Sequence, residues 1–208
     1  MKLLILGGFL GTGKTSVLMP VARQIVEAAG GGDKTRVAII ENEIGQVGID
    51  TAFTQGAGFT TTELFNGCVC CTLAASLMDS LVQLEKDVDP EWVILETTGL
   101  ARPHDIAESV KRYYDENMNT AVCITVDVNR WMKLKKIVGE LLFEQVSNAD
   151  FVFLNKIDLA DAQTIAAVHS DIEGLTKGRI FEISAYTDVP GTEKVCREVV
   201  DEILSRDA

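Results

Sequence analysis

The chain has 208 residues, of which 47% are hydrophobic and 24% charged, and this composition is that of one globular domain over residues 1–208. The formal net charge of -12 argues against a nucleic-acid-binding surface, which needs clustered Lys and Arg. No apolar run approaches the roughly 18 residues of a membrane span, and the run at residues 3–6 is too short for a signal peptide. We therefore expect a cytoplasmic protein with neither a nucleic acid nor a membrane as its partner.

The first predicted element is a short apolar strand, residues 3–6, followed by the sequence GFLGTGKT at residues 8–15 and then by a helical pattern. This order of strand, GxxxxGKT and helix is the context of a phosphate-binding P-loop. Glycines let the backbone N–H groups turn inward around a phosphate, and the helix N-terminus adds partial positive charge. We expect Lys14 to reach the β- and γ-phosphates and the Thr15 hydroxyl to hold Mg²⁺. The alternative is a Gly-rich turn before a helix.

Apolar runs alternate with helical spacing along the rest of the chain. The predicted strands are residues 3–6, 36–40, 60–65, 92–96, 120–126, 151–154 and 179–183. The predicted helices are residues 15–29, 73–86, 103–114, 130–146, 160–172 and 192–204. Pro20 predicts a kink or a short first segment in the first helix, and residues 41–58 read as a long polar loop. Apolar strands that alternate with helices indicate an α/β fold of the P-loop NTPase class, with a mainly parallel sheet and helices on both faces.

The sequence NKID, residues 155–158, follows a predicted strand. The carboxylate of Asp158 can accept two hydrogen bonds from the N1–H and the exocyclic amine of guanine, so it selects GTP over ATP. Asn155 would steady the loop and reach the base, and the aliphatic stem of Lys156 would lie on the ring face. The backbone of Ser184 and Ala185, after the last strand, could contact the guanine oxygen. A surface turn at NKID, and a helix-entry turn capped by Ser184, are the alternatives.

The sequence ETTG, residues 96–99, ends another apolar strand. A carboxylate at Glu96 can hold Mg²⁺ directly or through water and can orient an attacking water. The Gly99 N–H can meet the γ-phosphate and sense its loss. The alternative is that Glu96 only caps a helix.

Three of the five cysteines, Cys68, Cys70 and Cys71, form a CxCC cluster. Alternate thiols on an extended backbone can clasp one Zn²⁺, Co²⁺ or Cu⁺ ion, with oxygen from a nearby acid such as Glu41. The alternatives are buried small hydrophobes, a redox pair or a cluster without a role. The single Cys123 and Cys196 read as core residues, and no role is assigned to the two histidines, His104 and His169.

Together these motifs resemble the CobW-type branch of the CobW/HypB/UreG GTPases. The match covers about residues 3 to 185, and the motifs occur in the family's order: GFLGTGKT, ENEIGQVGID, ELFNGCVCC, ETTGLARP and NKID. The specific part is the CxCC between the P-loop and the ETTG strand, because a P-loop and NKxD alone indicate only a GTPase.

The resemblance implies slow GTP hydrolysis, and a role as metallochaperone or cofactor-assembly factor for zinc, cobalt/cobalamin or nickel proteins. Residues matching the phosphate and Mg²⁺ motifs are Gly8, Gly11, Thr12, Gly13, Lys14, Thr15, Ser16, Glu96 and Gly99, with Lys14, Glu96 and Gly99 as the catalytic candidates. Those matching the guanine motifs are Asn155, Lys156, Asp158, Ser184 and Ala185. Those matching the transition-metal motif are Cys68, Cys70, Cys71 and Glu41.

The expected partners are a metalloprotein or cobalamin-enzyme client and, because relatives often pair when nucleotide is bound, a GTP-dependent homodimer. Two departures from the family pattern stand out. Gln46 replaces an acid of the family's first loop, and the sequence stops at Ala208 without the usual C-terminal domain, so we expect the client to meet the GTPase domain itself. Two other functions stay open: a GTP-dependent gating factor that carries no metal, and a redox module built on Cys70 and Cys71.

Overall fold

The structure is a computed structural model that describes residues 1–28, 37–41, 59–63 and 72–206. At residues 41, 59–63 and 72–76 it describes the backbone alone. The predicted loop at residues 41–58 lies outside the described residues except for its first residue, which ends a strand. The CxCC cluster at residues 68–71 lies outside them altogether.

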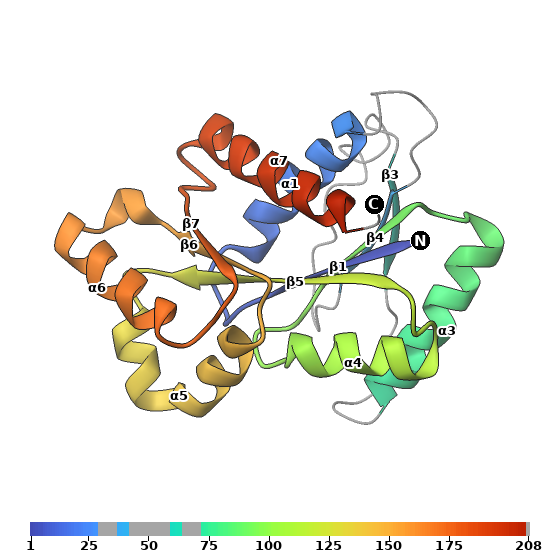
Figure 1. Ribbon diagram of the computed structural model, residues 1–208, viewed down its shortest axis with the longest axis horizontal. Coiled ribbons are helices and arrows are strands. Elements are labelled where there is room, and N and C mark those ends of the chain that lie inside the picture. The colour runs from blue at the N-terminus through green and yellow to red at the C-terminus, as the bar shows by residue number, and fades with distance from the viewer. Residues whose placement is uncertain (29–36, 42–58, 64–71, 207–208) are drawn as a thin grey trace.

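The strands of the described part of the chain form one parallel sheet (Figure 1), whose order is β3-β2-β4-β1-β5-β6-β7. Every neighbouring pair is parallel, so the carboxyl ends of all strands meet at one edge of the sheet. The bounds are β1 Lys2–Gly7, β2 Val37–Glu41, β3 Phe59–Glu63, β4 Trp92–Glu96, β5 Asn119–Asp127, β6 Phe151–Asn155 and β7 Arg179–Glu182. The predicted parallel α/β architecture is therefore confirmed.

Helices cover both faces of this sheet, as Figure 1 shows. The bounds are α1 Lys14–Ala28, α3 Thr72–Asp87, α4 Pro103–Tyr113, α5 Trp131–Ser147, α6 Ala162–Glu173 and α7 Val189–Ser205. Alternation along β1 divides the core: Leu4 and Leu6 pack with α1 and α7, whereas Leu3 and Ile5 pack with α3 to α6. Among the described helices, none has the length and apolar character of a membrane span.

Two details differ from the expected elements. A kink or a short first segment was expected at Pro20; the short segment is not found, because α1 runs from Lys14 to Ala28 with Pro20 buried inside it, and the kink stays a prediction. A proline there removes one backbone hydrogen bond, and packing of α1 on the sheet and on α7 keeps the helix together. An irregularity that was not expected lies in α5, where Val138 has non-helical dihedrals (φ -132°, ψ 35°) next to Gly139.

Candidate nucleotide site

The P-loop leaves β1 and returns into α1 through glycines with left-handed backbone conformations. Gly8, Gly11 and Gly13 have φ values of 133°, 74° and 98°. A Cβ at Gly8 would lie 2.2 Å from the Thr125 carbonyl oxygen, and one at Gly13 would lie 2.3 Å from Asn155 Nδ2. Both positions therefore require glycine for the backbone angle and for space.

Lys14 is the first residue of α1, and its side chain folds back over the loop. Its Nζ donates to the carbonyl oxygens of Gly8 at 3.1 Å and Phe9 at 3.4 Å, and the residue is 8% exposed. The ammonium thus lies against the backbone that would enclose a phosphate, and its contact with the phosphates stays a prediction.

Thr15 and Glu96 meet across the carboxyl edge of the sheet although 81 residues separate them. The Thr15 hydroxyl donates to Glu96 Oε1 at 2.9 Å, and Glu96 ends β4 with 5% exposure. A hydroxyl and a carboxylate are oxygen ligands of the kind that Mg²⁺ prefers, so the chemistry of this pair fits the ion expected there.

The segment after β4 lies directly against the P-loop. A Cβ at Gly99 would lie 2.7 Å from the Leu10 backbone nitrogen, so only glycine permits this approach. Gln145 of α5 fixes the segment from the other side, because its Nε2 donates to the carbonyl oxygens of Gly99 at 3.2 Å and Ala101 at 2.8 Å. Gln145 is 2% exposed and was not found by sequence reasoning.

Asn155 connects the NKID turn to two other loops. Its Nδ2 donates to the Thr12 carbonyl oxygen at 2.9 Å, while its Oδ1 accepts from the backbone N–H groups of Lys156 at 2.9 Å and Ala185 at 3.0 Å. The predicted steadying role therefore has a structural basis, and its contact with a base stays a prediction. The Ala185 N–H is already engaged, so a contact with a guanine oxygen would have to compete with Asn155.

The remaining predicted guanine contacts lie beside this asparagine. Asp158 is exposed in a 3-10 turn, η1 Ile157–Leu159, and its N–H donates to the Ser184 hydroxyl at 3.2 Å. Ser184 therefore supports the turn that presents Asp158. The Lys156 ammonium donates to the Gly11 carbonyl oxygen at 2.7 Å and to the Asp127 carboxylate at 2.7 Å.

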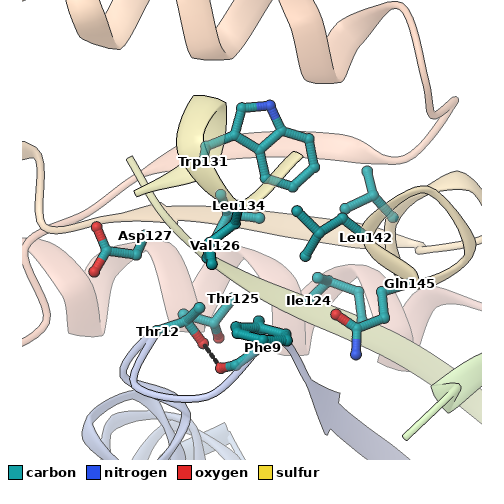
Figure 2. Close-up of a pocket in the computed structure, with 11 residues that line it drawn as sticks. Phe9, Thr12, Ile124, Thr125, Val126, Asp127, Trp131, Leu134, Leu142 and Gln145 are labelled. Carbon is teal, nitrogen blue, oxygen red and sulfur yellow. Dashed lines mark hydrogen bonds between the residues drawn. The ribbon is translucent and has the colours of Figure 1, made fainter. Parts of the chain in front are cut away.

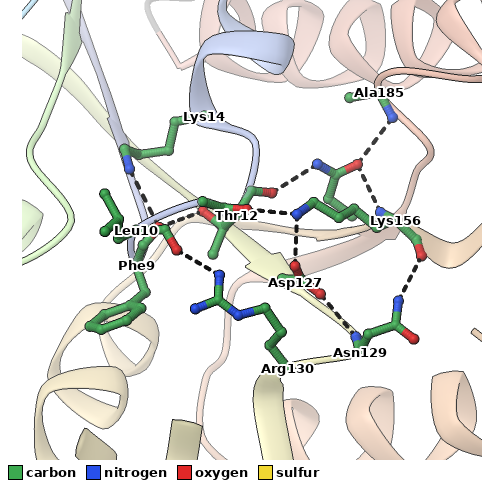
Figure 3. Close-up of polar contacts among 11 residues, drawn as sticks. Phe9, Leu10, Thr12, Lys14, Asp127, Asn129, Arg130, Lys156 and Ala185 are labelled. Atoms are coloured by element: carbon green, nitrogen blue, oxygen red, sulfur yellow. Dashed lines mark hydrogen bonds and ion pairs between the residues drawn. The ribbon is translucent and has the colours of Figure 1, made fainter. Parts of the chain in front are cut away.

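Three consecutive P-loop carbonyls are held by side chains from the ends of β5 and β6 (Figure 3). Arg130 donates to the Leu10 oxygen at 2.9 Å, Lys156 to that of Gly11, and Asn155 to that of Thr12. Sequence reasoning found Asn155 and Lys156 but missed Asp127 and Arg130. The available signal was their position just after the 120–126 strand, at the carboxyl edge.

A small cavity of about 10 Å³ separates the P-loop from α5. Figure 2 shows Phe9 and Thr12 of the P-loop on one side of it and Trp131 and Leu142 of α5 on the other. The Thr125 hydroxyl lines this cavity, is fully buried, and has no hydrogen-bond partner among the described residues. The cavity has room for about one water molecule and not for a nucleotide.

The transition-metal residues are not brought together by what the structure describes. Cys68, Cys70 and Cys71 lie outside the described residues, and the backbone places Glu41 at the end of β2, in register with Glu96. No group of three His, Cys, Asp or Glu within the described ranges could hold a metal ion.

The other two cysteines are core residues, as expected. Cys123 and Cys196 are buried free thiols. Burial raises the pKa of the Cys123 thiol well above its usual value and, with Glu193 nearby, that of Cys196 to about 12. Both thiols therefore stay protonated and unreactive in the folded chain.

Comparisons with known proteins give matches over most of the chain. A family model described as CobW/HypB/UreG, nucleotide-binding domain, matches residues 2–181. The chain is 31% identical to a zinc chaperone CobW of Pseudomonas aeruginosa, over 82% of this chain and 52% of that protein. It is 28% identical to a zinc chaperone CobW of a Sinorhizobium species, over 87% of this chain and 58% of that protein.

Among solved structures, the hydrogenase maturation factor HypB of Archaeoglobus fulgidus has a TM-score of 0.65 at 19% identity, covering 98% of this chain and 90% of that chain. This likeness shows the fold. The chain spans about half the length of the curated relatives it matches.

Proposed function

Because this chain belongs to the CobW/HypB/UreG family, we propose that it binds and slowly hydrolyses GTP and acts as a metallochaperone or metal-cofactor assembly factor. The observation that carries the nucleotide part of the proposal is the pair of hydrogen bonds that join Asn155 to Thr12 and to Ala185. These contacts join the P-loop, the NKID turn and the loop after β7 that contains Ala185, and so support the proposal that the three segments form one site. A single ligand with a triphosphate and a guanine base is long enough to use all three.

The residues present suggest how hydrolysis is assisted. Lys14 neutralises charge on the β- and γ-phosphates, while Thr15 and Glu96 would hold Mg²⁺, which supplies further charge neutralisation. Glu96 would also orient the attacking water. The Gly99 N–H would meet the γ-phosphate from a segment that already touches the P-loop at Leu10.

The metal part of the proposal rests on the CxCC cluster and on the names of the relatives. Cys68, Cys70 and Cys71 lie between the end of β3 and the start of α3, and the β3 end belongs to the same sheet edge as Glu96. A thiolate site there, with Glu41 at the neighbouring strand end, could change with the nucleotide state. Two curated relatives are zinc chaperones, so Zn²⁺ is the ion we propose first, with Co²⁺ next.

The nucleotide assignment is tested by Asp158→Asn. The amide loses one of the two acceptors that guanine needs, so GDP affinity should fall by about tenfold or more and the preference over ADP should shrink. Asp201→Asn is the matched control, because Asp201 is an exposed residue of α7 with the same charge. Isothermal titration with GDP and ADP measures both effects. An unchanged preference in Asp158→Asn would refute the guanine assignment.

The metal assignment is tested by Cys70→Ser, with Cys196→Ala as a buried-thiol control. Zn²⁺ affinity of the reduced protein, measured by competition with a chelator dye in GTP and in GDP, should fall strongly in Cys70→Ser and stay unchanged in the control. Equal Zn²⁺ affinity in the wild type, Cys70→Ser and Cys196→Ala would overturn the metal site. Retained GTP binding without metal binding would instead favour a gating factor for a cobalamin or other metalloenzyme.

A further inference from the structure

Carbonyl oxygens of the P-loop accept hydrogen bonds from side chains of other elements. In a trans peptide the C=O and the following N–H point to opposite sides. Holding the Leu10 and Thr12 oxygens from outside therefore turns the Gly11 and Gly13 N–H groups to the other side of the loop. The middle carbonyl, that of Gly11, is held by Lys156 at 2.7 Å.

Lys156 is in a strained conformation that its surroundings enforce. Its φ of 67° is left-handed, which is unfavourable for a residue with a Cβ. Its N–H donates to Asn155 Oδ1, its C=O accepts from Asn129 Nδ2 at 3.3 Å, and its ammonium is bound at both Gly11 and Asp127. Strain of this kind persists only where several contacts determine it, and such residues cluster at functional sites.

Asp127 is the residue on which these contacts depend. It ends β5, in register with Asn155, and is 3% exposed. Its Oδ2 accepts from Lys156 Nζ at 2.7 Å and its Oδ1 from the Asn129 N–H at 3.0 Å, while its backbone oxygen accepts from the Arg130 N–H at 3.1 Å. One buried residue thus bonds the Lys156 side chain and the Arg130 backbone, and these are two of the three residues whose side chains hold the loop.

We propose that Asp127 is a positioning residue for nucleotide binding, which holds Lys156 on the Gly11 carbonyl and so pre-organises the P-loop for phosphate (Figure 3). The inference rests on the proposed function, since it names how the GTP site is prepared. Asp127 belongs to no motif, and in this proposal it links the NKID turn to the P-loop through Lys156.

The test is a double-mutant cycle of Asp127→Asn and Lys156→Met. Asparagine keeps the size of Asp127 and an oxygen for the Asn129 N–H, but it turns an amide toward Lys156 and loses the charge. GDP affinity and the GDP dissociation rate are measured with a fluorescent GDP analogue and Mg²⁺. In Asp127→Asn the affinity should fall and the dissociation rate should rise, each by about tenfold, which is the equivalent of one charge-assisted hydrogen bond. In the Lys156→Met background, Asp127→Asn should add less than about twofold, because its effect passes through Lys156.

Asp171→Asn is the matched control. Asp171 also accepts two hydrogen bonds, from Trp131 at 2.7 Å and Lys135 at 2.6 Å, but it joins α5 to α6. It should lower thermal stability while leaving GDP dissociation unchanged. If Asp127→Asn does not fold, Asn129→Ala is the second variant, because the Asn129 side chain is exposed and donates to the Lys156 carbonyl oxygen. It should speed GDP release by about two- to threefold, the equivalent of one neutral hydrogen bond.

The outcomes separate the two proposals. Additive effects of Asp127→Asn and Lys156→Met, or a wild-type rate of GDP release in both Asp127→Asn and Asn129→Ala, would overturn the positioning role alone. A wild-type chain that binds no guanine nucleotide would overturn the proposed function and this inference together.

Discussion

Replacing Gly99 by alanine would force the segment after β4 away from the P-loop. The added Cβ would lie 2.7 Å from the Leu10 nitrogen, 3.0 Å from its Cα and 3.2 Å from its Cβ. None of these atoms can rotate away, because they belong to the backbone or are fixed to it. Ordinary van der Waals contact begins at 3.4 Å, so the two segments must separate by about 0.7 Å.

The cost of this separation can be worked from the packing. Inserting one carbon into a well-packed contact costs about 1–3 kcal/mol. For a chain of this size, that lowers the melting temperature by roughly 4–8 °C at the middle of the range. Gln145 adds to the cost, because the carbonyls that it holds at Gly99 and Ala101 must move as well.

Gly139→Ala is the matched control. A Cβ at Gly139 meets nothing nearer than the Lys135 Cγ at 3.9 Å, and alanine is more favourable than glycine inside a helix by about 0.5–1 kcal/mol. This variant should melt at or slightly above the wild-type temperature. The same glycine-to-alanine change should therefore act in opposite directions at the two positions.

Differential scanning fluorimetry measures the stability, and single-turnover GTP hydrolysis measures the function. Gly99→Ala should slow hydrolysis and weaken GTP binding more than GDP binding, because the contact that we propose between the Gly99 N–H and the γ-phosphate would be displaced. The reasoning is refuted if Gly99→Ala melts no lower than Gly139→Ala and hydrolyses GTP at the wild-type rate.

Three further predictions concern stability. Burial alone would raise the pKa of Asp171, but hydrogen bonds from Lys135 and from the Trp131 indole hold this pKa below its usual value. The stability that Asp171 contributes is therefore present above about pH 4 and is lost as the pH falls through the lowered pKa. Melting curves at falling pH should show this loss in wild type and a smaller one in Asp171→Asn; parallel curves would contradict it. Burial and Glu193 raise the pKa of Cys196 to about 12, so its neutral thiol should stabilise the fold fully below about pH 8.5 and progressively less toward pH 12, with a shallower alkaline loss in Cys196→Ala. The Thr125 hydroxyl is buried with no partner among the described residues, beside a cavity with room for about one water. If the cavity is dry, Thr125→Val should raise the melting temperature, because it removes an unsatisfied group that costs about 1–3 kcal/mol; a lower melting temperature would mean that a water satisfies the hydroxyl.

Much of the site could be predicted from the sequence because short motifs encode it. The GFLGTGKT motif predicted a turn between a strand and a helix, and the structure has left-handed glycines there, with α1 starting at Lys14. The family indicated by the ordered motifs is confirmed by the family model over residues 2–181. The short first segment that Pro20 offered as one of two expectations is wrong, because packing holds α1 together from Lys14 to Ala28 despite the low helix propensity of proline.

The residues that the sequence did not reveal have no motif. Asp127, Arg130 and Gln145 are single polar residues after a strand or within a helix, and such residues are usually solvated. Their roles depend on β5 lying between β1 and β6, which brings Asp127 beside Asn155 and Arg130 to the P-loop. Strand order is set by long-range packing, which local periodicity does not contain.

The sequence by itself determined the elements, the phosphate loop and the turn proposed to read guanine, because glycine geometry and side-chain chemistry act over a few residues. Only the tertiary structure decided what supports them. Lys156 was expected to contribute its stem to a base, and the fold directs its ammonium to Gly11 and Asp127. The reason is physical: the parallel sheet gathers all strand ends at one edge, and the order of the strands selects which side chains meet there.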